Sequence, residues 1–303
     1  MRSLKNLLSK IRRVRFFTQR SSHTFFEGHL ISLPSRHSLF ELQIQEPFRH
    51  QALKLAAKYF LTEQKNHVID VGANVGDTAI VMNSGNHTKK TFSLVEPSPF
   101  FLKYLNRNSR IIGDCEIIEK FVSPNFPISE LSADLQYWGG TALLVDSSTN
   151  KVTKSQQILL HELERDNTGI VKIDCDGQDS NILINYLEHS KSLPTIYFEN
   201  TIASTSDLYK SLEVLELARN MGYGFVSALS NDGLLIWSGE LKLESLRDIY
   251  QFQLNLTNLN QSNRLSYTDI LLVQKSESES FFKFEKELRQ HQENHFTSSS
   301  KSG

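Results

Sequence analysis

The stretch HVIDVGANVGDTA, residues 67–79, decides the fold. Its first half is a short apolar run that ends in a glycine, a pattern that predicts a buried strand. A helix is expected from about Val75, so a glycine-containing loop joins the strand to the helix. In an open parallel sheet, ligands bind beyond the carboxyl ends of the strands, where such loops lie. Residues 67–79 therefore predict both a central strand and a ligand-binding loop.

Strand-like and helix-like segments alternate along the chain beyond this stretch. Further strands are expected at residues 91–97, 115–123, 170–176, 195–200 and 265–274. Helices are expected after Ser98, which can cap a helix with Pro99 in its first turn, from about Asp179, and over about 205–221. Asn231-Asp232-Gly233 predicts a tight turn between two strands. The alternation predicts an α/β, Rossmann-like fold with a mostly parallel sheet and helices on both faces.

The length of 303 residues and the hydrophobic content of 39% allow one packed domain with appendages. We expect a basic N-terminal arm at residues 1–40, the α/β domain at 41–275 and a polar, disordered tail at 276–303 that starts as a charged helix. Apolar residues recur at helical spacing in the arm, which makes weak peripheral membrane contact an alternative to a solvated arm. Its first twenty residues lack acids and carry the cations Arg2, Lys5, Lys10, Arg12, Arg13, Arg15 and Arg20.

Composition narrows the classes of function. The net charge of -1 gives no general attraction for nucleic acid. The chain has no run of about 18 apolar residues, so no transmembrane helix is predicted. Cys115 and Cys175 are expected to be buried thiols, so a reducing cytoplasm fits the chain best. Residues 124–150 show neither helical nor strand periodicity; they are expected either to cover the substrate site or to form a surface insertion.

The loop after the first strand and the end of the second strand supply a candidate cofactor site. Gly72 permits a sharp turn and close approach of a ligand, and Gly76 permits close packing of the next helix. Glu96 ends the second strand, where a carboxylate can accept both hydroxyls of a ribose. The candidate cofactor-binding residues are Asp70, Gly72, Asn74, Gly76, Asp77, Thr78 and Glu96.

Two cofactors with a ribose fit this spacing. A pyrophosphate requires a second glycine in the loop, as in nicotinamide-binding proteins, and that position is Asn74 here. S-adenosylmethionine has no pyrophosphate but carries an ammonium and a sulfonium, which acids such as Asp70 and Asp77 suit. The loop therefore favours S-adenosylmethionine, with NAD as the alternative.

Charged residues interrupt the fourth strand, VKIDCDGQD at 171–179. Burying such charges without a purpose is costly. The alternation of a strand places Lys172, Asp174 and Asp176 on one side, near the cofactor cleft. These three are the candidate catalytic residues. The two aspartates can act as a proton acceptor, or they can hold a divalent metal. His161 is an alternative base, although a surface helix position is the plainer interpretation.

The chain resembles the FkbM family of methyltransferases in four stretches. These are VIDVGANVGDTA (68–79), LVEPSPFFLKYLNRN (94–108), VKIDCDGQDSNIL (171–183) and TIYFEN (195–200). Many members have Glu at the positions of Asp176 and Asp179. The variant with Asp at both resembles a branch often met near bacterial sugar- and polysaccharide-building genes, as do GYGFVSALSNDG and YTDILLV. The resemblance covers about residues 65–275.

The resemblance implies a seven-stranded class I fold whose last strand runs antiparallel. It also implies S-adenosylmethionine-dependent O-methylation, often of a sugar or polyketide hydroxyl. The resemblance assigns no base; on the residues themselves, Asp174 is the first choice of base and Asp176 the second. A small-molecule or glycan acceptor is therefore expected. A nicotinamide-dependent oxidoreductase and a cofactor-binding protein without catalytic activity are the alternatives.

Overall fold

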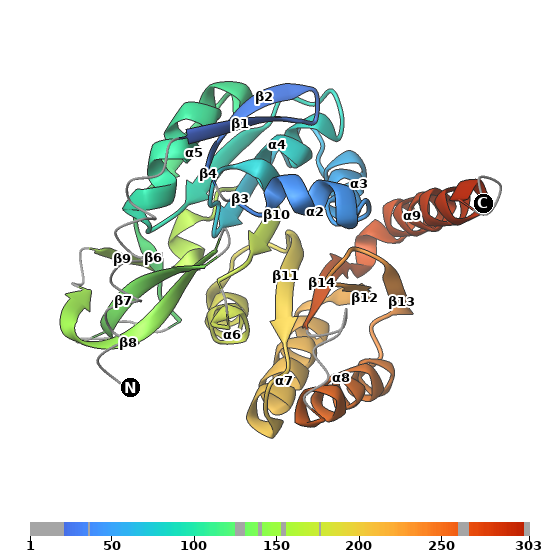
Figure 1. Ribbon diagram of the computed structural model, residues 1–303. Coiled ribbons are helices and arrows are strands. Elements are labelled where there is room, and N and C mark those ends of the chain that lie inside the picture. The colour runs from blue at the N-terminus through green and yellow to red at the C-terminus, as the bar shows by residue number, and fades with distance from the viewer. Residues whose placement is uncertain are drawn as a thin grey trace.

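The computed structural model describes residues 21–35, 37–124, 131–138, 141–152, 156–175, 177–259 and 267–299. At the centre of the described chain lies an eight-stranded sheet (Figure 1). In spatial order its strands are β13 (Leu235–Glu240), β12 (Tyr223–Ser230), β14 (Tyr267–Gln274), β11 (Thr195–Thr201), β10 (Thr168–Ile173), β3 (His67–Val71), β4 (Thr91–Val95) and β5 (Cys115–Ile118).

The pairing confirms the expected fold class. Strands β5, β4, β3, β10 and β11 are parallel neighbours, whereas β14 runs antiparallel between β11 and β12. This antiparallel last strand is the one that the class I fold requires. The expected number of seven strands is wrong by one for this sheet. The segment after the turn at 231–233 pairs with β12 as an additional edge strand, β13.

Helices cover both faces of the sheet because successive strand residues point to opposite sides. One face packs against α3 (Gln51–Phe60), α4 (Asp77–Ser84), α5 (Pro99–Ile112) and α9 (Ser278–Ser299). The other packs against η2 (Leu160–Leu163), α6 (Asp179–His189), α7 (Thr205–Met221) and α8 (Leu243–Asn258). The predicted cap is present, because the Ser98 hydroxyl accepts from the Phe101 amide at 3.4 Å and Pro99 follows it.

The prediction of a disordered tail is wrong for residues 278–299. These residues form helix α9 after the short turn η3 (Lys275–Glu277). Phe281, Phe284 and Leu288 are fully buried against the sheet and α3. Their rings and side chains recur three and four residues apart, so one face of the helix is apolar although its composition is polar. Lys58 on α3 also pairs with Glu287 at 2.6 Å.

The prediction of an arm at residues 1–40 is also partly wrong. Strands β1 (Ser21–Phe26) and β2 (His29–Pro34) form an antiparallel hairpin, followed by helix α2 (Leu39–Gln45). Ile31 and Leu33 are buried in the domain core. Two hydrogen bonds fasten the hairpin to α5, because the backbone of Ser32 donates to and accepts from the Asn108 side chain at 2.8 and 3.0 Å. Residues 1–20 lie outside the described part.

The region at 124–150, expected to be irregular, contains two paired strands. Strands β7 (Leu131–Trp138) and β8 (Thr141–Val152) form a separate antiparallel sheet. The two strands are therefore recognised by their pairing with each other, because their sequence shows no strand periodicity. Short strands β6 (Phe121–Val122) and β9 (Gln157–Ile158) pair in parallel before and after this region. The covering role expected for it stays a prediction.

Candidate functional site

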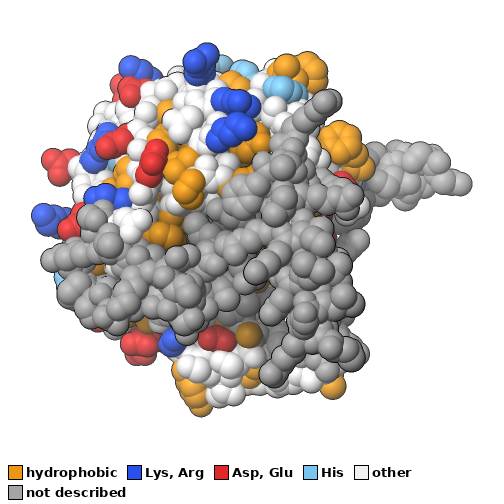
Figure 2. Space-filling view, turned by 60° about the vertical axis from the view of Figure 1, so that its left-hand side comes forward, with side chains coloured by type: hydrophobic (Ala, Val, Ile, Leu, Met, Phe, Trp, Pro, Cys, Tyr) orange, Lys and Arg blue, Asp and Glu red, His pale blue; other side chains and the backbone are white. Residues whose placement is uncertain are grey.

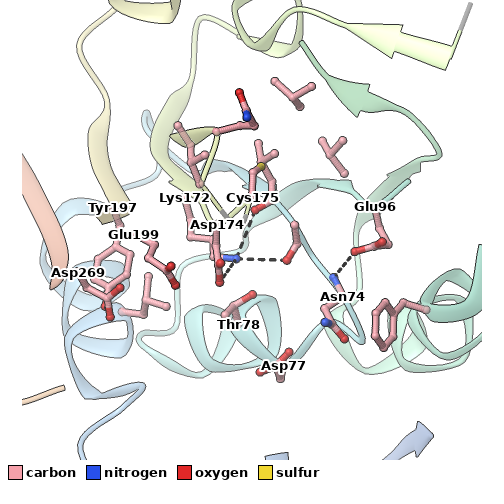
Figure 3. A pocket seen from close by; sticks show the side chains of 18 of the residues that line it. Asn74, Asp77, Thr78, Glu96, Lys172, Asp174, Cys175, Tyr197, Glu199 and Asp269 are labelled. Carbon is pink, nitrogen blue, oxygen red and sulfur yellow. Dashed lines mark hydrogen bonds and ion pairs between the residues drawn. The ribbon is translucent and has the colours of Figure 1, made fainter. Parts of the chain in front are cut away.

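A cavity lies at the carboxyl ends of β3, β4, β10 and β11, where the sequence places the ligand (Figure 3). The loops after β3, β4 and β10 form its floor, and α2 with the start of α3 contributes to its rim. Two groups of polar residues lie apart in it. Glu96 and Asn74 occupy one end, Tyr197, Glu199 and Asp269 the other, and Asp174 stands between them.

The backbone of β10 explains the first glycine of the loop. Gly72 has a φ of 74°, in the left-handed region that favours glycine. A Cβ at this position would lie 2.0 Å from the carbonyl oxygen of Asp174. From the sequence, a glycine at position 72 is expected because the backbone there lies close to the cofactor. The structure shows that a side chain here collides with the neighbouring strand end before any ligand is considered.

Gly76 and Asn74 in the same loop also have positive φ angles. Gly76 leaves room for Ile112 and Leu105 of α5, because a Cβ there would lie 2.9 and 3.0 Å from their methyl groups. This agrees with the packing role expected for Gly76. Asn74, at a φ of 50°, places its side-chain oxygen 3.1 Å from the His37 Nε2. His37 Nδ1 accepts from the Leu39 amide, so Nε2 carries the proton and donates to Asn74.

Glu96 is held by backbone groups on both oxygens. Its Oε2 accepts from the Asn74 amide at 2.9 Å and its Oε1 from the Ser98 amide at 2.8 Å. Burial raises the pKa of Glu96 to about 7, and the two backbone hydrogen bonds oppose that rise. Each carboxylate oxygen has two lone pairs, so one on each remains for a ligand. Glu96 therefore suits a pair of neighbouring hydroxyl groups.

Asp77 and Thr78, at the start of α4, have different partners. Asp77 lies 3.5 Å from His50 Nε2 on the rim of the cavity. Burial alone would raise the pKa of Asp77, but His50, His37 and Lys172 lower it to about 2. Thr78 donates its hydroxyl to Asp70 Oδ2 at 2.6 Å. Thus Asp77 keeps a negative charge at the cavity, whereas Thr78 supports a buried acid beneath it.

Lys172 is the centre of a buried ionic network that the sequence predicts in part. Its Nζ lies 3.2 Å from Asp70 Oδ1 and 3.4 Å from Asp174 Oδ2. It also donates to the carbonyl oxygens of Val71 and Gly72, each at 3.3 Å. Burial alone would lower the pKa of Lys172, but the two aspartates raise it above its ordinary range. The ammonium is therefore charged and joins the tips of β3 and β10.

Of the acids in this network, Asp174 reaches the cavity. Its side chain is 44% exposed, while those of Asp70 and Lys172 are 0% and 3% exposed. Asp176, the other acid expected at the reaction centre, lies outside the described residues. The expectation that both cysteines are buried is wrong. Both are half-buried, and Cys175 lines the cavity beside Asp174.

The far end of the cavity carries two acids that sequence reasoning missed. Glu199 on β11 and Asp269 on β14 are opposite each other in the strand register. Tyr197 donates its hydroxyl to Asp269 Oδ2 at 2.8 Å. Burial and nearby Asp174 raise the pKa of Glu199 to about 9 and that of Asp269 to about 7. Near neutral pH, Glu199 is therefore protonated and can donate a hydrogen bond.

Asp179 and His161 do not contribute to the cavity lining. Asp179 at the start of α6 accepts from the backbone amides of Cys175 and Gly177 at 3.0 and 3.2 Å. It thereby closes the loop that follows β10. His161, the alternative base, lies in η2, where its ring stacks on His189 at a centroid distance of 5.1 Å. The structure places it away from the proposed reaction centre.

Other lining residues were not among the candidate site residues predicted from the sequence. His37 and His50 come from the connection before α2 and the one before α3, and Arg49, Tyr197 and Tyr267 line the same cavity. A weak signal existed for the two far-end acids, because Glu199 directly follows an apolar run and Asp269 directly precedes one. Among the described residues, no group of three or more His, Cys, Asp and Glu side chains could hold a metal ion.

A scan against protein-family models finds no match, and neither does a search of curated proteins. The chain is similar to the solved structure of TYW2 from M. jannaschii in complex with AdoMet, at 12% identity and a TM-score of 0.42, over 84% of this chain and 86% of that chain. Likeness of this strength concerns the course of the chain and says nothing about its ligand.

Two further structures show the same degree of likeness. The plantazolicin methyltransferase BpumL in complex with SAH has 12% identity and a TM-score of 0.37, over 80% of this chain and 92% of that one. A precorrin-6y methyltransferase from Geobacter metallireducens has 15% identity and a TM-score of 0.38, over 73% and 87%. Separately, no helix within the described ranges is long and apolar enough to cross a membrane.

Proposed function

We propose that the chain is an S-adenosylmethionine-dependent O-methyltransferase whose acceptor is a hydroxyl of a sugar or glycan. The observation that carries the proposal is the order of groups along one cavity. A backbone-held carboxylate, Glu96, lies at one end, a partly exposed acid, Asp174, in the middle, and a pair of acids, Glu199 and Asp269, at the other end. Cofactor, reaction centre and acceptor can occupy these three places in turn.

The loop geometry supports S-adenosylmethionine over a dinucleotide. In a pyrophosphate-binding loop, backbone amides after the strand bind phosphate oxygens. Here the Asn74 amide donates to Glu96 instead. Acids at Asp77 and Asp174 also face the cavity, and they would repel a pyrophosphate while attracting an ammonium or a sulfonium. These residues therefore fit a cationic cofactor with a ribose.

Asp174 is the proposed proton acceptor. S-adenosylmethionine would supply an activated methyl group whose transfer releases a neutral thioether. Asp174 would receive the hydroxyl proton as the acceptor oxygen forms its bond to the methyl carbon. Lys172 is buried beneath Asp174 and lies 3.4 Å from its carboxylate. We therefore assign Lys172 a positioning role rather than the catalytic role expected from the sequence.

The far end of the cavity supports a hydroxyl-bearing acceptor. Glu199 can donate a hydrogen bond when protonated, and Asp269 can accept one. Sugar hydroxyls both donate and accept, so a carboxyl and a carboxylate side by side can bind neighbouring hydroxyl groups. Arg49 and Tyr267 lie at the same end and extend the range of polar partners.

A binding experiment tests the cofactor. Titration calorimetry should detect binding of S-adenosylhomocysteine and no comparable binding of NAD. Glu96→Gln should weaken S-adenosylhomocysteine binding at least about tenfold, because a charge-assisted hydrogen bond contributes about 1.5–3 kcal/mol. Glu119→Gln, which alters an exposed acid beyond β5, is the matched control and should bind normally. Tighter binding of NAD than of S-adenosylhomocysteine would contradict the proposal.

A turnover experiment tests the chemistry. Methyl transfer from labelled S-adenosylmethionine is measured against a panel of sugar nucleotides and glycans. With an accepted substrate, Asp174→Asn should reduce turnover by about two to four orders of magnitude while S-adenosylhomocysteine affinity stays within about twofold. Addition of a chelator separates metal placement from direct proton transfer. Near-normal turnover of Asp174→Asn would remove Asp174 from the reaction centre.

A further inference from the structure

Exposed apolar side chains gather on the hairpin and on α2. Phe25 and Leu30 face each other across the hairpin and are 73% and 55% exposed. Phe40 and Ile44, one helical turn apart on α2, are 56% and 70% exposed. The Gln43 side chain donates to the Phe25 carbonyl at 3.4 Å, which joins the two elements. Clustered exposure of large apolar residues marks an interaction surface more often than isolated exposure does.

Helix α5 adds a basic stripe beside these residues. Lys103, Arg107 and Arg110 are exposed and recur four and three residues apart, so they share one side of the helix. The sequence of α5, residues 99–112, contains no acid. Figure 2 shows Lys and Arg side chains near exposed hydrophobic ones at the upper edge of the molecule, the height at which Figure 1 places the hairpin.

Specific contacts bring the three elements together. The backbone of Ser32 on β2 is hydrogen-bonded to Asn108 of α5. His37, just before α2, meets Phe101 near the start of α5 with their ring centroids 6.1 Å apart. The hairpin, α2 and α5 are therefore neighbours in the fold. We call their exposed apolar and basic side chains the docking face and define it by Phe25, Leu30, Phe40, Ile44, Lys103, Arg107 and Arg110.

The sequence that leads into the docking face has the same character. Residues 1–20 carry seven cations and no acid, and they also contain Phe16 and Phe17. They join the hairpin directly at Ser21. A polybasic stretch next to exposed aromatic and aliphatic residues is the combination that binds anionic lipid headgroups and the upper acyl region together.

We infer that the docking face binds the surface of an anionic lipid bilayer. Aliphatic side chains such as Leu30 and Ile44 favour lipid over a nucleic acid, because they offer no stacking plane for a base. Helix α2 connects this face to the cavity, since Leu39 and Leu42 line the cavity while Phe40 and Ile44 are exposed. Docking would thus hold the mouth of the cavity near the lipid surface. The inference does not depend on which cofactor the cavity binds.

Vesicle sedimentation of the full chain tests this inference. The protein should sediment with vesicles of phosphatidylcholine mixed with phosphatidylglycerol, and much less with phosphatidylcholine alone. Binding should weaken as the salt concentration rises, because screening reduces attraction between exposed charges. The double variant Phe40→Ser/Ile44→Ser should reduce partitioning at least about tenfold, since it removes most of the apolar area of α2. Lys103→Gln/Arg107→Gln should reduce binding only to the anionic vesicles.

A variant of exposed apolar residues elsewhere on the protein serves as the control. Tyr209→Ser/Phe252→Ser removes two exposed apolar residues from α7 and α8 and should leave vesicle binding unchanged. All variants should keep the wild-type unfolding midpoint. Equal vesicle binding by the wild type and the α2 variant would overturn the inference. So would binding of the wild type to single-stranded RNA but not to vesicles, or a dimer that the α2 variant dissociates while no vesicle is bound.

Discussion

The two ends of the cavity are built differently. Two backbone amides hold Glu96, one from Ser98 in the loop after β4 and one from Asn74 in the loop after β3. At the far end side chains hold side chains, as in the hydrogen bond from Tyr197 to Asp269 across 72 positions of the chain. An acid held by backbone amides does not depend on the side chains that the donor residues carry. An acid held by another side chain changes with either partner, so the far end can vary while the cofactor end stays the same.

The largest expected effect is at Lys172, which joins the middle of the cavity to β3. Lys172→Met should destabilise the fold by about 3–5 kcal/mol, because it leaves the buried Asp70 without its cation. Urea unfolding measures the change in the free energy of unfolding. The double variant Lys172→Met/Asp70→Asn should recover part of the loss, since it also removes the unpaired charge. A loss below about 1 kcal/mol in Lys172→Met would show that the network does not hold the two strand tips.

The next effect concerns the glycine beneath the cofactor end. Gly72→Ala should cost about 1–2 kcal/mol for its left-handed backbone and about 1–3 kcal/mol more for overlap with the Asp174 carbonyl. Gly28→Ala is the matched control. Gly28 also has a positive φ, but a Cβ there would meet nothing within 4 Å. The difference between the two variants in urea unfolding isolates the overlap, and equal costs would show that β10 yields to the extra methyl group.

Cofactor binding at the Glu96 end should depend on pH. Burial raises the pKa of Glu96 to about 7, and ribose hydroxyls donate to its ionised form. Binding therefore releases a proton below that pH, so affinity for S-adenosylhomocysteine should fall as the pH drops below about 7, by at most about tenfold per unit. Calorimetry between pH 5.5 and 8, roughly the range around this pKa, measures the trend. Glu96→Gln should show a flatter profile, and an unchanged slope would assign the proton to another group.

The smallest expected effect is at the far end. Tyr197→Phe should cost about 0.5–1.5 kcal/mol through loss of one hydrogen bond, with S-adenosylhomocysteine affinity unchanged. Tyr223→Phe is its control, because Tyr223 donates to the Pro194 carbonyl at 2.7 Å and does not line the cavity. Both variants should lose similar stability in urea unfolding. A tenfold weaker cofactor affinity in Tyr197→Phe alone would show that the two ends of the cavity are coupled.

Local patterns predicted the elements that rest on neighbouring residues. The cap at Ser98, the bounds of α7 at 205 and 221 and the packing role of Gly76 all agree with expectation. Composition misled at the C-terminal end. Polar residues dominate 276–303, but Phe281, Phe284 and Leu288 occur at helical spacing and bury one face of α9. Periodicity was therefore the better guide there, because burial depends on one face and not on the average.

Sequence pattern was enough to predict the strand and glycine loop that begin at His67, a helix from about Val75 and Glu96 at the end of the next strand. Those features depend on residues close together in the chain. Tertiary structure alone decided that Lys172 lies between Asp70 and Asp174, and that Glu199 lies opposite Asp269. Lys172 and Asp70 are adjacent because β10 pairs with β3 in one register. A shift of that register by one residue would point the lysine to the opposite face of the sheet.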